Sequence, residues 1–325
     1  MFDVHFHWFP EDLLERARQR FPDVFFLRLP LERIDDSIRM MDDYGIETSL
    51  IVYGAYLGMV IEAASDVREE AYRMLLERTA ERCARHPGRF LHVAVIDAGA
   101  GEGAVSQLER AVKEYGCAAL EMDTCYERDG ETIFPQERHF WPLYAKAQEL
   151  DVPVFFHPRV PPFWRKLPSN IQFTAVDWGF LMSNQLAIQM MAYGGVFDAF
   201  PTLQFIFCQL GGFVPFSLGR SDLNFAMHEE FPTRHTNSPD LKVVKLRDYA
   251  GRFYVDIHSM DTAAIRCAAE TLGAEHILFA TDFPVTPLKM GAPWHLEELR
   301  QSGLREEAIE AIKIGNARTL FKLPK

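Results

Sequence analysis

The 325-residue sequence has no long hydrophobic run, no low-complexity stretch and no excess of positive charge. Apolar runs stay well short of the ~20 residues that span a bilayer, which excludes a transmembrane segment. With 34 Lys and Arg against 46 Asp and Glu, the formal charge is −12. This balance argues against nucleic acid or an anionic membrane as a partner. A small anionic substrate held by a few local arginines remains compatible with it.

Cysteines are also few. The five of them are scattered and include no CxxC pair: Cys83, Cys117, Cys125, Cys208 and Cys267. Buried thiols in a reducing cytoplasm explain this pattern better than disulfides. The first residues, Met1–His5, lack the basic and apolar regions of a secretory signal peptide. We therefore expect a cytoplasmic protein.

Strand-like and helix-like segments alternate along the whole chain. Eight short apolar segments predict strands: Met1–His7, Thr48–Tyr53, Phe90–Ile96, Cys117–Met122, Val152–His157, Leu203–Cys208, Phe253–Ile257 and His276–Thr281. Helical spacing occurs between them, as in these segments: Val67–Arg85, Gly103–Tyr115, Glu137–Leu150 and Thr262–Leu272. Apolar strands alternating with helices are typical of a covered parallel sheet. Eight such units predict one α/β domain over 1–325, a (β/α)8 TIM-like barrel with short insertions.

The connecting segments give three further expectations. The irregular segments Asp123–Pro135 and Arg159–Ala175 follow strands, on the face where barrel enzymes build their sites, and we expect them to shape the pocket. A third irregular segment is His228–Asp240. Phe9–Leu29 is rich in Phe and Pro and is expected to form a lid or a dimer contact. Glu306–Phe321 predicts two closing helices.

His5 and His7 lie two residues apart on the first predicted strand. Side chains with this spacing point to the same face of a strand. Both imidazoles therefore project together from the strand end toward the barrel axis, which is a common way of gripping a divalent metal. Two histidines placed by chance on a surface strand would show the same pattern.

Two other predicted strands end in groups that can bind a metal. His157 ends the fifth strand, and Asp282 ends the eighth. Taken singly, the histidine could bond to backbone and the aspartate could cap a helix. Taken together with the HxH pair, these strand ends predict one divalent ion at the C-terminal mouth of the barrel. Its expected ligands are His5, His7, His157 and Asp282.

The chain resembles the amidohydrolase-related (amidohydrolase 2) family of the amidohydrolase superfamily, which includes carboxymuconate-semialdehyde and γ-resorcylate-type decarboxylases. The resemblance covers nearly the whole chain and rests on these segments: Asp3–His7, Arg89-Phe90, Val154–Pro158, Gly194–Phe197, Leu210–Arg220, Ile277–Pro284 and Asn316–Lys322. It implies a zinc-dependent non-oxidative decarboxylase, a C–C lyase acting on a small aromatic or conjugated carboxylic acid. One Zn²⁺ would sit on the four ligands, with Mn²⁺ as the alternative ion. A hydrolase or hydratase of a lactone or amide, and a barrel that binds without turnover, are the competing hypotheses.

Gln209 departs from the family pattern. The relatives carry a histidine at the end of the sixth strand that acts as a base on metal-bound water, and here Gln209 takes its place. An amide cannot take a proton at neutral pH, although it can orient a water or a substrate oxygen. We expect Asp282 to shuttle the proton instead. Four further groups are candidates for this role or for plain structural contacts: Glu121, Asp123, Asp177 and His258. Glu121 could also bridge two ions, but without the sixth-strand histidine we expect only one.

Substrate binding is expected from arginines and aromatic residues. The resemblance implies that Arg220 reaches across a homodimer interface to clamp a substrate carboxylate, a task that suits a planar guanidinium. A surface salt bridge is the alternative. Arg159, directly after His157-Pro158, is a second expected carboxylate ligand. Trp178 and Phe283 either line the pocket of a flat conjugated substrate or belong to the core.

Overall fold

A computed structural model of the protein describes residues 1–64, 68–98, 101–172, 174–231, 241–258, 260–286 and 291–323. Eight parallel strands form one sheet in the order β1-β2-β3-β4-β7-β8-β9-β10. Their bounds are β1 Phe2–His7, β2 Thr48–Val52, β3 Phe90–Ala94, β4 Ala119–Asp123, β7 Val154–His157, β8 Phe205–Phe207, β9 Tyr254–Asp256 and β10 Ile277–Leu278. All eight lie within or next to the segments expected from the sequence.

The sheet closes between its first and last strands. The amide of Val4 donates to the carbonyl of Phe279 at 3.0 Å, and the amide of Asp282 donates to the carbonyl of His5 at 2.8 Å. Phe6 also forms a parallel bridge with Phe283. Because the strands are buried on both faces, most of their residues are apolar. The expected (β/α)8 barrel is confirmed.

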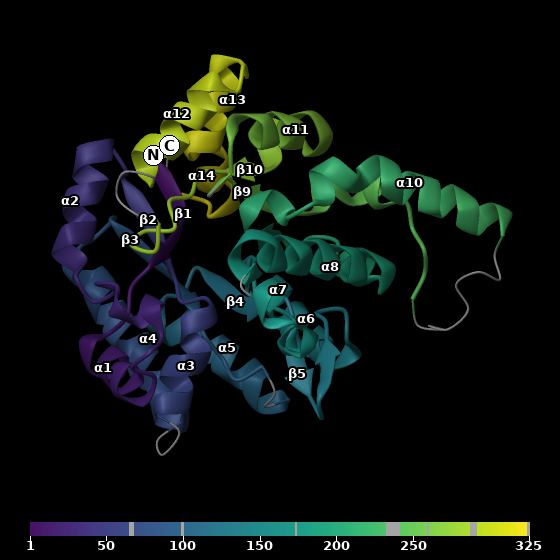
Figure 1. The fold of residues 1–325 in the computed structure, drawn as a ribbon. Coiled ribbons are helices and arrows are strands. Elements are labelled where there is room, and N and C mark those ends of the chain that lie inside the picture. The colour runs from purple at the N-terminus through teal and green to yellow at the C-terminus, as the bar shows by residue number, and fades with distance from the viewer. Residues whose placement is uncertain are drawn as a thin grey trace.

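Helices surround the barrel (Figure 1). Their bounds are α1 Glu11–Arg20, α2 Ile34–Tyr44, α3 Ala55–Ala63, α4 Arg68–Arg85, α5 Glu102–Tyr115, α6 Trp141–Glu149, α7 Ser169–Gln172, α8 Phe180–Tyr193, α9 Val196–Ala199, α10 Val214–Glu230, α11 Thr262–Leu272, α12 Ala292–Gln301, α13 Glu306–Glu310 and α14 Asn316–Leu320. The long helix α10 projects away from the barrel body (Figure 1). No helix within the described ranges combines the length and apolarity needed to cross a membrane.

One expected irregular segment, Asp123–Pro135, contains an antiparallel hairpin of β5 Tyr126–Arg128 and β6 Glu131–Ile133. Its turn is Asp129-Gly130, with φ angles of 55° and 80°. Two consecutive positive φ angles are what a tight hairpin turn requires, and an Asp-Gly pair supplies them at low cost. The sequence signal was therefore present in this pair. In the third irregular segment, residues 232–240 lie outside the described residues.

The segments at the two chain ends pack against the barrel. In Phe9–Leu29, α1 buries Leu13, Leu14 and Ala17, so this helix has a core face. At the other end, two closing helices were expected from Glu306–Phe321, but α13 and α14 are joined by a π-helical turn at Ala311–Gly315 and form one continuous helix. Phe2 stacks on Phe321 with ring centroids 5.4 Å apart, and the two termini lie side by side (Figure 1).

Candidate metal centre

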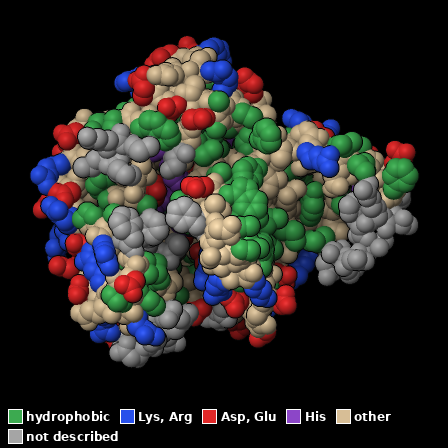
Figure 2. Space-filling model, in the orientation of Figure 1, with side chains coloured by type: hydrophobic (Ala, Val, Ile, Leu, Met, Phe, Trp, Pro, Cys, Tyr) green, Lys and Arg blue, Asp and Glu red, His purple; other side chains and the backbone are tan. Residues whose placement is uncertain are grey.

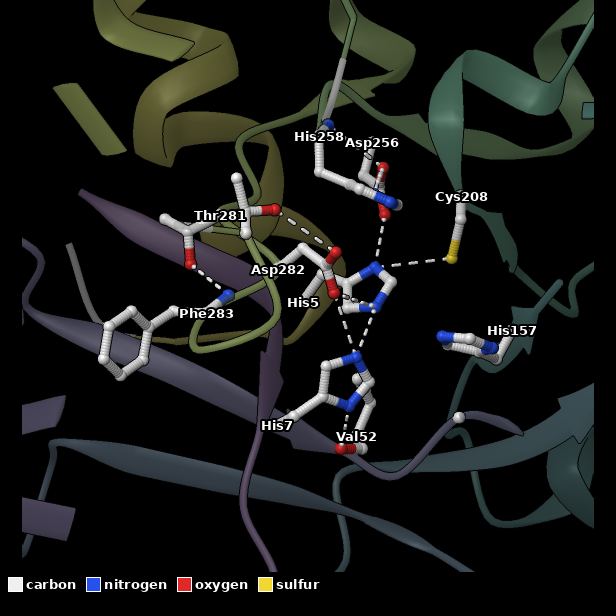
Figure 3. Close-up of polar contacts among 12 residues, drawn as sticks. His5, His7, Val52, His157, Cys208, Asp256, His258, Thr281, Asp282 and Phe283 are labelled. Carbon is white, nitrogen blue, oxygen red and sulfur yellow. Dashed lines mark hydrogen bonds and ion pairs between the residues drawn. The ribbon is translucent and has the colours of Figure 1, made fainter. Parts of the chain in front are cut away.

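Four side chains from three strand ends converge at the C-terminal mouth of the barrel (Figure 3). His5 and His7 leave the end of β1 on one face, and their Nε2 atoms lie 3.2 Å apart. Asp282 Oδ1 lies 3.1 Å from His7 Nε2 and 3.6 Å from His5 Nε2. His157, from the end of β7, completes a group of three imidazoles whose candidate ligand atoms lie within 4.8 Å of one another. The structure thus brings the four expected ligands together.

The other ring nitrogen of each histidine is held by an acceptor. His7 Nδ1 lies 2.9 Å from the carbonyl of Val52, and His157 Nδ1 lies 3.0 Å from the carbonyl of Pro158. His5 Nδ1 lies 3.1 Å from a carboxylate oxygen of Asp256. Because these oxygens only accept, each Nδ1 carries the proton and each Nε2 presents a lone pair. This is the usual support of metal-bound histidines.

The donor set fits a divalent cation. Two Nε2 lone pairs 3.2 Å apart repel each other unless a positive ion lies between them. The carboxylate of Asp282 adds a negative oxygen on the same side. Three imidazoles and one carboxylate are a ligand set that suits zinc and related divalent ions.

Burial keeps the donors in their metal-binding forms. It lowers the pKa of His5 to about 4 and that of His157 well below the usual histidine value. Burial alone would raise the pKa of Asp282, but the neighbouring imidazoles, His7 and His258 foremost, lower it below its usual range. At neutral pH these two imidazoles are therefore neutral and the carboxylate is ionised, as metal binding requires.

Two residues of the site have strained backbones. Asp282 has a φ of 56° and Gln209 a φ of 54°, in the left-handed region that few residues other than glycine adopt. Hydrogen bonds hold this conformation at Asp282. Its backbone amide donates to the carbonyl of His5, and its carbonyl accepts from the amides of Val285 and Thr286. Such conformations persist where the surrounding structure enforces them and are frequent at functional sites.

Asp256 is the site residue that sequence reasoning missed. From the end of β9 its Oδ1 accepts from His258 Nδ1 at 2.7 Å and from the amide of Gln209 at 2.9 Å. Its Oδ2 contacts His5. The negative charge of Asp256 outweighs burial and raises the pKa of His258 to about 9. The two-residue spacing of Asp256 and His258 at a strand end, as in the HxH pair, was the available signal.

A cavity of about 510 Å³ opens at the metal centre and is lined by three of the four expected ligands. Its wall comprises His7, Met59, His157, Pro158, Val176, Asp177, Phe180, Leu181, Gln209, His258, Met260, Asp282 and Val285. Figure 2 shows histidine surface at the bottom of a depression on this face. Gln209 is buried here and its Oε1 accepts from Asn184 Nδ2 at 3.3 Å. Three residues that the sequence offered for the chemistry of the site, Asp177, Gln209 and His258, thus line this cavity.

The other expected binding residues are not on the wall of this cavity. Arg159 forms an ion pair with Asp123 at 2.9 Å and lines a neighbouring cavity of about 320 Å³. Phe283 is buried and stacks on Phe6. Trp178 is 46% exposed and packs against Trp164, with ring centroids 5.2 Å apart. Arg220 lies on the surface of α10.

Glu121 hydrogen-bonds to the backbone after β2 and lines the neighbouring cavity of about 320 Å³. Its two carboxylate oxygens accept the amide protons of Tyr53 and Gly54 at 2.8 and 2.6 Å. Both oxygens are therefore engaged with backbone amides, which agrees with the structural contact that was one of the roles considered for Glu121.

The family model named amidohydrolase matches residues 2–323. The chain belongs to the amidohydrolase family. It is 29% identical over 301 residues to the γ-resorcylate decarboxylase of Polaromonas sp. strain JS666, which covers 89% of this chain and 87% of that protein. It is 26% identical over 235 residues to the 2-amino-3-carboxymuconate-6-semialdehyde decarboxylase of Dictyostelium discoideum, covering 69% of this chain and 59% of that protein.

A solved structure shows the same fold with a metal. The dihydroxybenzoic acid decarboxylase of Polaromonas sp. JS666, with bound manganese and the inhibitor 2-nitroresorcinol, superposes with a TM-score of 0.79. The two proteins are 26% identical, and the match covers 100% of this chain and 97% of that one. The resemblance expected from the sequence motifs is confirmed.

Proposed function

We propose that this protein is a divalent-metal-dependent, non-oxidative decarboxylase that acts on a small aromatic or conjugated carboxylic acid. The observation that carries this proposal is the set of three Nε2 lone pairs and one carboxylate around a common point, beneath a cavity of about 510 Å³. Zinc is the proposed ion, on the ligands His5, His7, His157 and Asp282. Manganese is the alternative, because a structural relative holds it.

The residues in and around the cavity have different roles in the proposed reaction. When bound, the ion supplies Lewis acidity beside the carboxylate that leaves as CO₂. A proton must then replace the carboxylate on carbon, and Asp282 and His258 are ionisable groups on the cavity wall that can handle it. Gln209 orients a water or a substrate oxygen through its side-chain amide. Asp256 holds His258 and the amide of Gln209 in place.

We also propose a homodimer that uses the surface of α10. Phe216 on this helix is 87% exposed, and Arg220 follows one turn later on the same face. Figure 2 shows hydrophobic side chains gathered near α8 and α10. Burial of an exposed aromatic against a second copy would bring Arg220 toward the neighbouring site.

Arg220 and Arg159 are the proposed partners of substrate carboxylate groups. Trp178 and Phe283 are proposed to contact the substrate ring or to support the residues that do.

The proposed location is the cytoplasm. All five cysteines are free thiols in the structure, and three of them are buried. Free thiols without disulfides are typical of proteins in a reducing compartment.

Gln209 favours one competing function. Because its amide cannot take a proton, a hydrolase or hydratase in which Asp282 alone handles the proton of a water molecule fits the same site. Such an enzyme would open a lactone or an amide, or hydrate a double bond, without releasing CO₂.

The two functions are separated by one panel of assays. Metal-stripped protein is reloaded with Zn²⁺ or Mn²⁺ and incubated with dihydroxybenzoates, conjugated dicarboxylic acids, lactones and amides. Metal-dependent CO₂ release from an acid, abolished in His157→Ala, supports the decarboxylase. Water-dependent opening of a lactone or amide without CO₂ supports the hydrolase instead. Substrate binding without any turnover in either metal form contradicts both.

A further inference from the structure

The end of β2 lies between two of the proposed metal ligands. The carbonyl of Val52, the last residue of this strand, accepts from His7 Nδ1 at 2.9 Å. Two residues later, Gly54 lies against the imidazole of His157. A Cβ atom placed on Gly54 would lie 2.5 Å from His157 Nε2, the nitrogen that faces the metal centre. One short backbone segment, Val52–Gly54, therefore sets the positions of two imidazoles.

Glu121, on β4, hydrogen-bonds to this segment across the intervening strand β3. It is 7% exposed, and its two oxygens accept the consecutive amide protons of Tyr53 and Gly54 at 2.8 and 2.6 Å. Two parallel amide donors require two acceptors, which a carboxylate offers and a carboxamide does not. Gly54 has a φ of +63° and would leave this conformation easily without such a clamp.

We propose that Glu121 is a positioning residue of the metal centre. It does not ligate the ion. By fixing the Val52–Gly54 segment, it holds two groups in the places that metal binding needs. These are the carbonyl of Val52, which accepts from His7, and the backbone of Gly54, which contacts the ring of His157. This role rests on the proposed metal-dependent function, since it concerns the same ligands. Outer groups of this kind are worth about 10–100-fold in metal affinity.

The first test is Glu121→Gln, which keeps the shape but turns an NH₂ group toward one of the two backbone amides. Zinc affinity is measured by competition with a chromophoric chelator, and the coordination geometry by the d–d absorption of the Co²⁺-loaded protein. We expect affinity to fall about 10–100-fold and the Co²⁺ spectrum to change. The matched control is Glu298→Gln, because Glu298 accepts the amide of Thr262 at 2.7 Å outside the metal centre. This control should bind zinc as the wild type does.

The second test examines the route through Gly54. Gly54→Ala places a methyl group against His157, whereas Gly45→Ala adds one at a similar φ of +71° with nothing within 4 Å. Both substitutions strain the backbone to a similar extent, but only Gly54→Ala adds a contact with His157. Only Gly54→Ala should therefore weaken zinc binding. If Glu121 acts through this segment, the losses from Glu121→Gln and Gly54→Ala will not add in the double variant.

A lower melting temperature of Glu121→Gln with unchanged zinc affinity and Co²⁺ spectrum would overturn the positioning role, because the carboxylate would then be merely structural. Additive losses in the double variant would also overturn it. If the wild type itself binds no divalent ion, the proposed function fails and not the role of Glu121. In that case ¹⁵N NMR of the metal-free protein decides: unchanged ring-nitrogen signals of His7 and His157 in Glu121→Gln exclude the positioning role.

Discussion

Asp256 Oδ2 accepts the Nδ1 proton of His5 across 3.1 Å, deep within the barrel mouth. Both residues are fully buried, so this contact is shielded from water. The contact fixes the tautomer of His5 and directs its Nε2 toward His7 and Asp282. The same carboxylate holds His258 through its second oxygen. One buried charge therefore connects a proposed ligand to a second ionisable group of the cavity.

Asp256→Asn should weaken metal binding. The amide keeps one acceptor oxygen and cannot serve both His5 and His258 at once, so the ring of His5 loses its fixed orientation. We expect zinc affinity to fall about 10–100-fold, measured by chelator competition. Asp261→Asn is the control, because Asp261 caps α11 through the amide of Ala264 at 2.9 Å and lies outside the ligand set. Equal affinities for the two variants would show that Asp256 does not support the ligand.

His157→Ala should lose the metal. His157 is the only one of the three histidines that comes from β7, and without it the site keeps the two imidazoles of β1 and one carboxylate. Plasma mass spectrometry of the purified protein should find well under one zinc per chain, while the wild type holds about one. His92→Ala changes a buried histidine outside the ligand group and should retain the metal. Full zinc occupancy of His157→Ala would mean that the ligands are misassigned.

The sequence was sufficient for the fold because the signal is repeated. Each strand of the barrel is buried on both faces, so eight apolar segments such as Val154–His157 stand out between amphipathic helices. The exact ends of helices were harder to predict from the sequence. The helix expected over Glu137–Leu150 begins at Trp141, because Arg138–Phe140 forms a tighter turn and Pro142 favours the first turn of the α-helix.

The candidate ligands could also be expected from the sequence, because their positions follow from strand ends and two-residue spacing. Their partners could not. Asp256 contacts His5 only because closure of the barrel places β9 next but one to β1, although the two residues are 251 positions apart in the chain. For Glu121 the sequence left a proton-transfer role and a structural contact open, and the side chain accepts from the backbone after β2. Such choices depend on the packing around each side chain, which spacing along one strand does not determine.

Asp282→Asn should separate metal binding from turnover. The carboxamide can still offer an oxygen to the ion, and the three imidazoles are unchanged, so we expect most of the zinc to remain. A carboxamide cannot carry a proton, and activity should fall by about 10²–10⁴-fold, the usual contribution of a positioned acid or base. Metal analysis and the CO₂ assay on the same sample measure the two effects. Activity near that of the wild type would exclude Asp282 as the proton carrier.

The buried His92 should make the metal-free protein sensitive to acid. Burial lowers its pKa, and its Nε2 lies 3.0 Å from the carbonyl of Tyr115. A depressed folded-state pKa means that stability is complete above the unfolded value near ~6.5 and is lost as pH falls toward the folded value. His92→Gln keeps a donor but does not titrate. Its cost in free energy of unfolding, measured by chemical denaturation, should therefore shrink between pH 7.5 and pH 5. A cost that is constant over this range would contradict the shift.

Gln209→His should reveal which chemistry the barrel performs. The side chain at position 209 lines the cavity beside His258 and Asp282, so an imidazole there would stand where a proton can be passed to the reacting carbon. Histidine also tolerates the positive φ of this position better than most residues. If the protein is a decarboxylase in which the amide only orients groups, CO₂ release should rise, by up to the ~10²–10⁴-fold that a positioned acid or base supplies.

The control for this variant is Gln209→Leu, which fills similar space without hydrogen bonds and should lower activity through lost orientation alone. Zinc content must be equal in the wild type and both variants, since Gln209 is not a proposed ligand. If Gln209→His loses activity as Gln209→Leu does, then the amide itself is required at the end of β8. That outcome would move the assignment from decarboxylation toward a hydrolytic reaction in which Gln209 directs a water and Asp282 takes its proton.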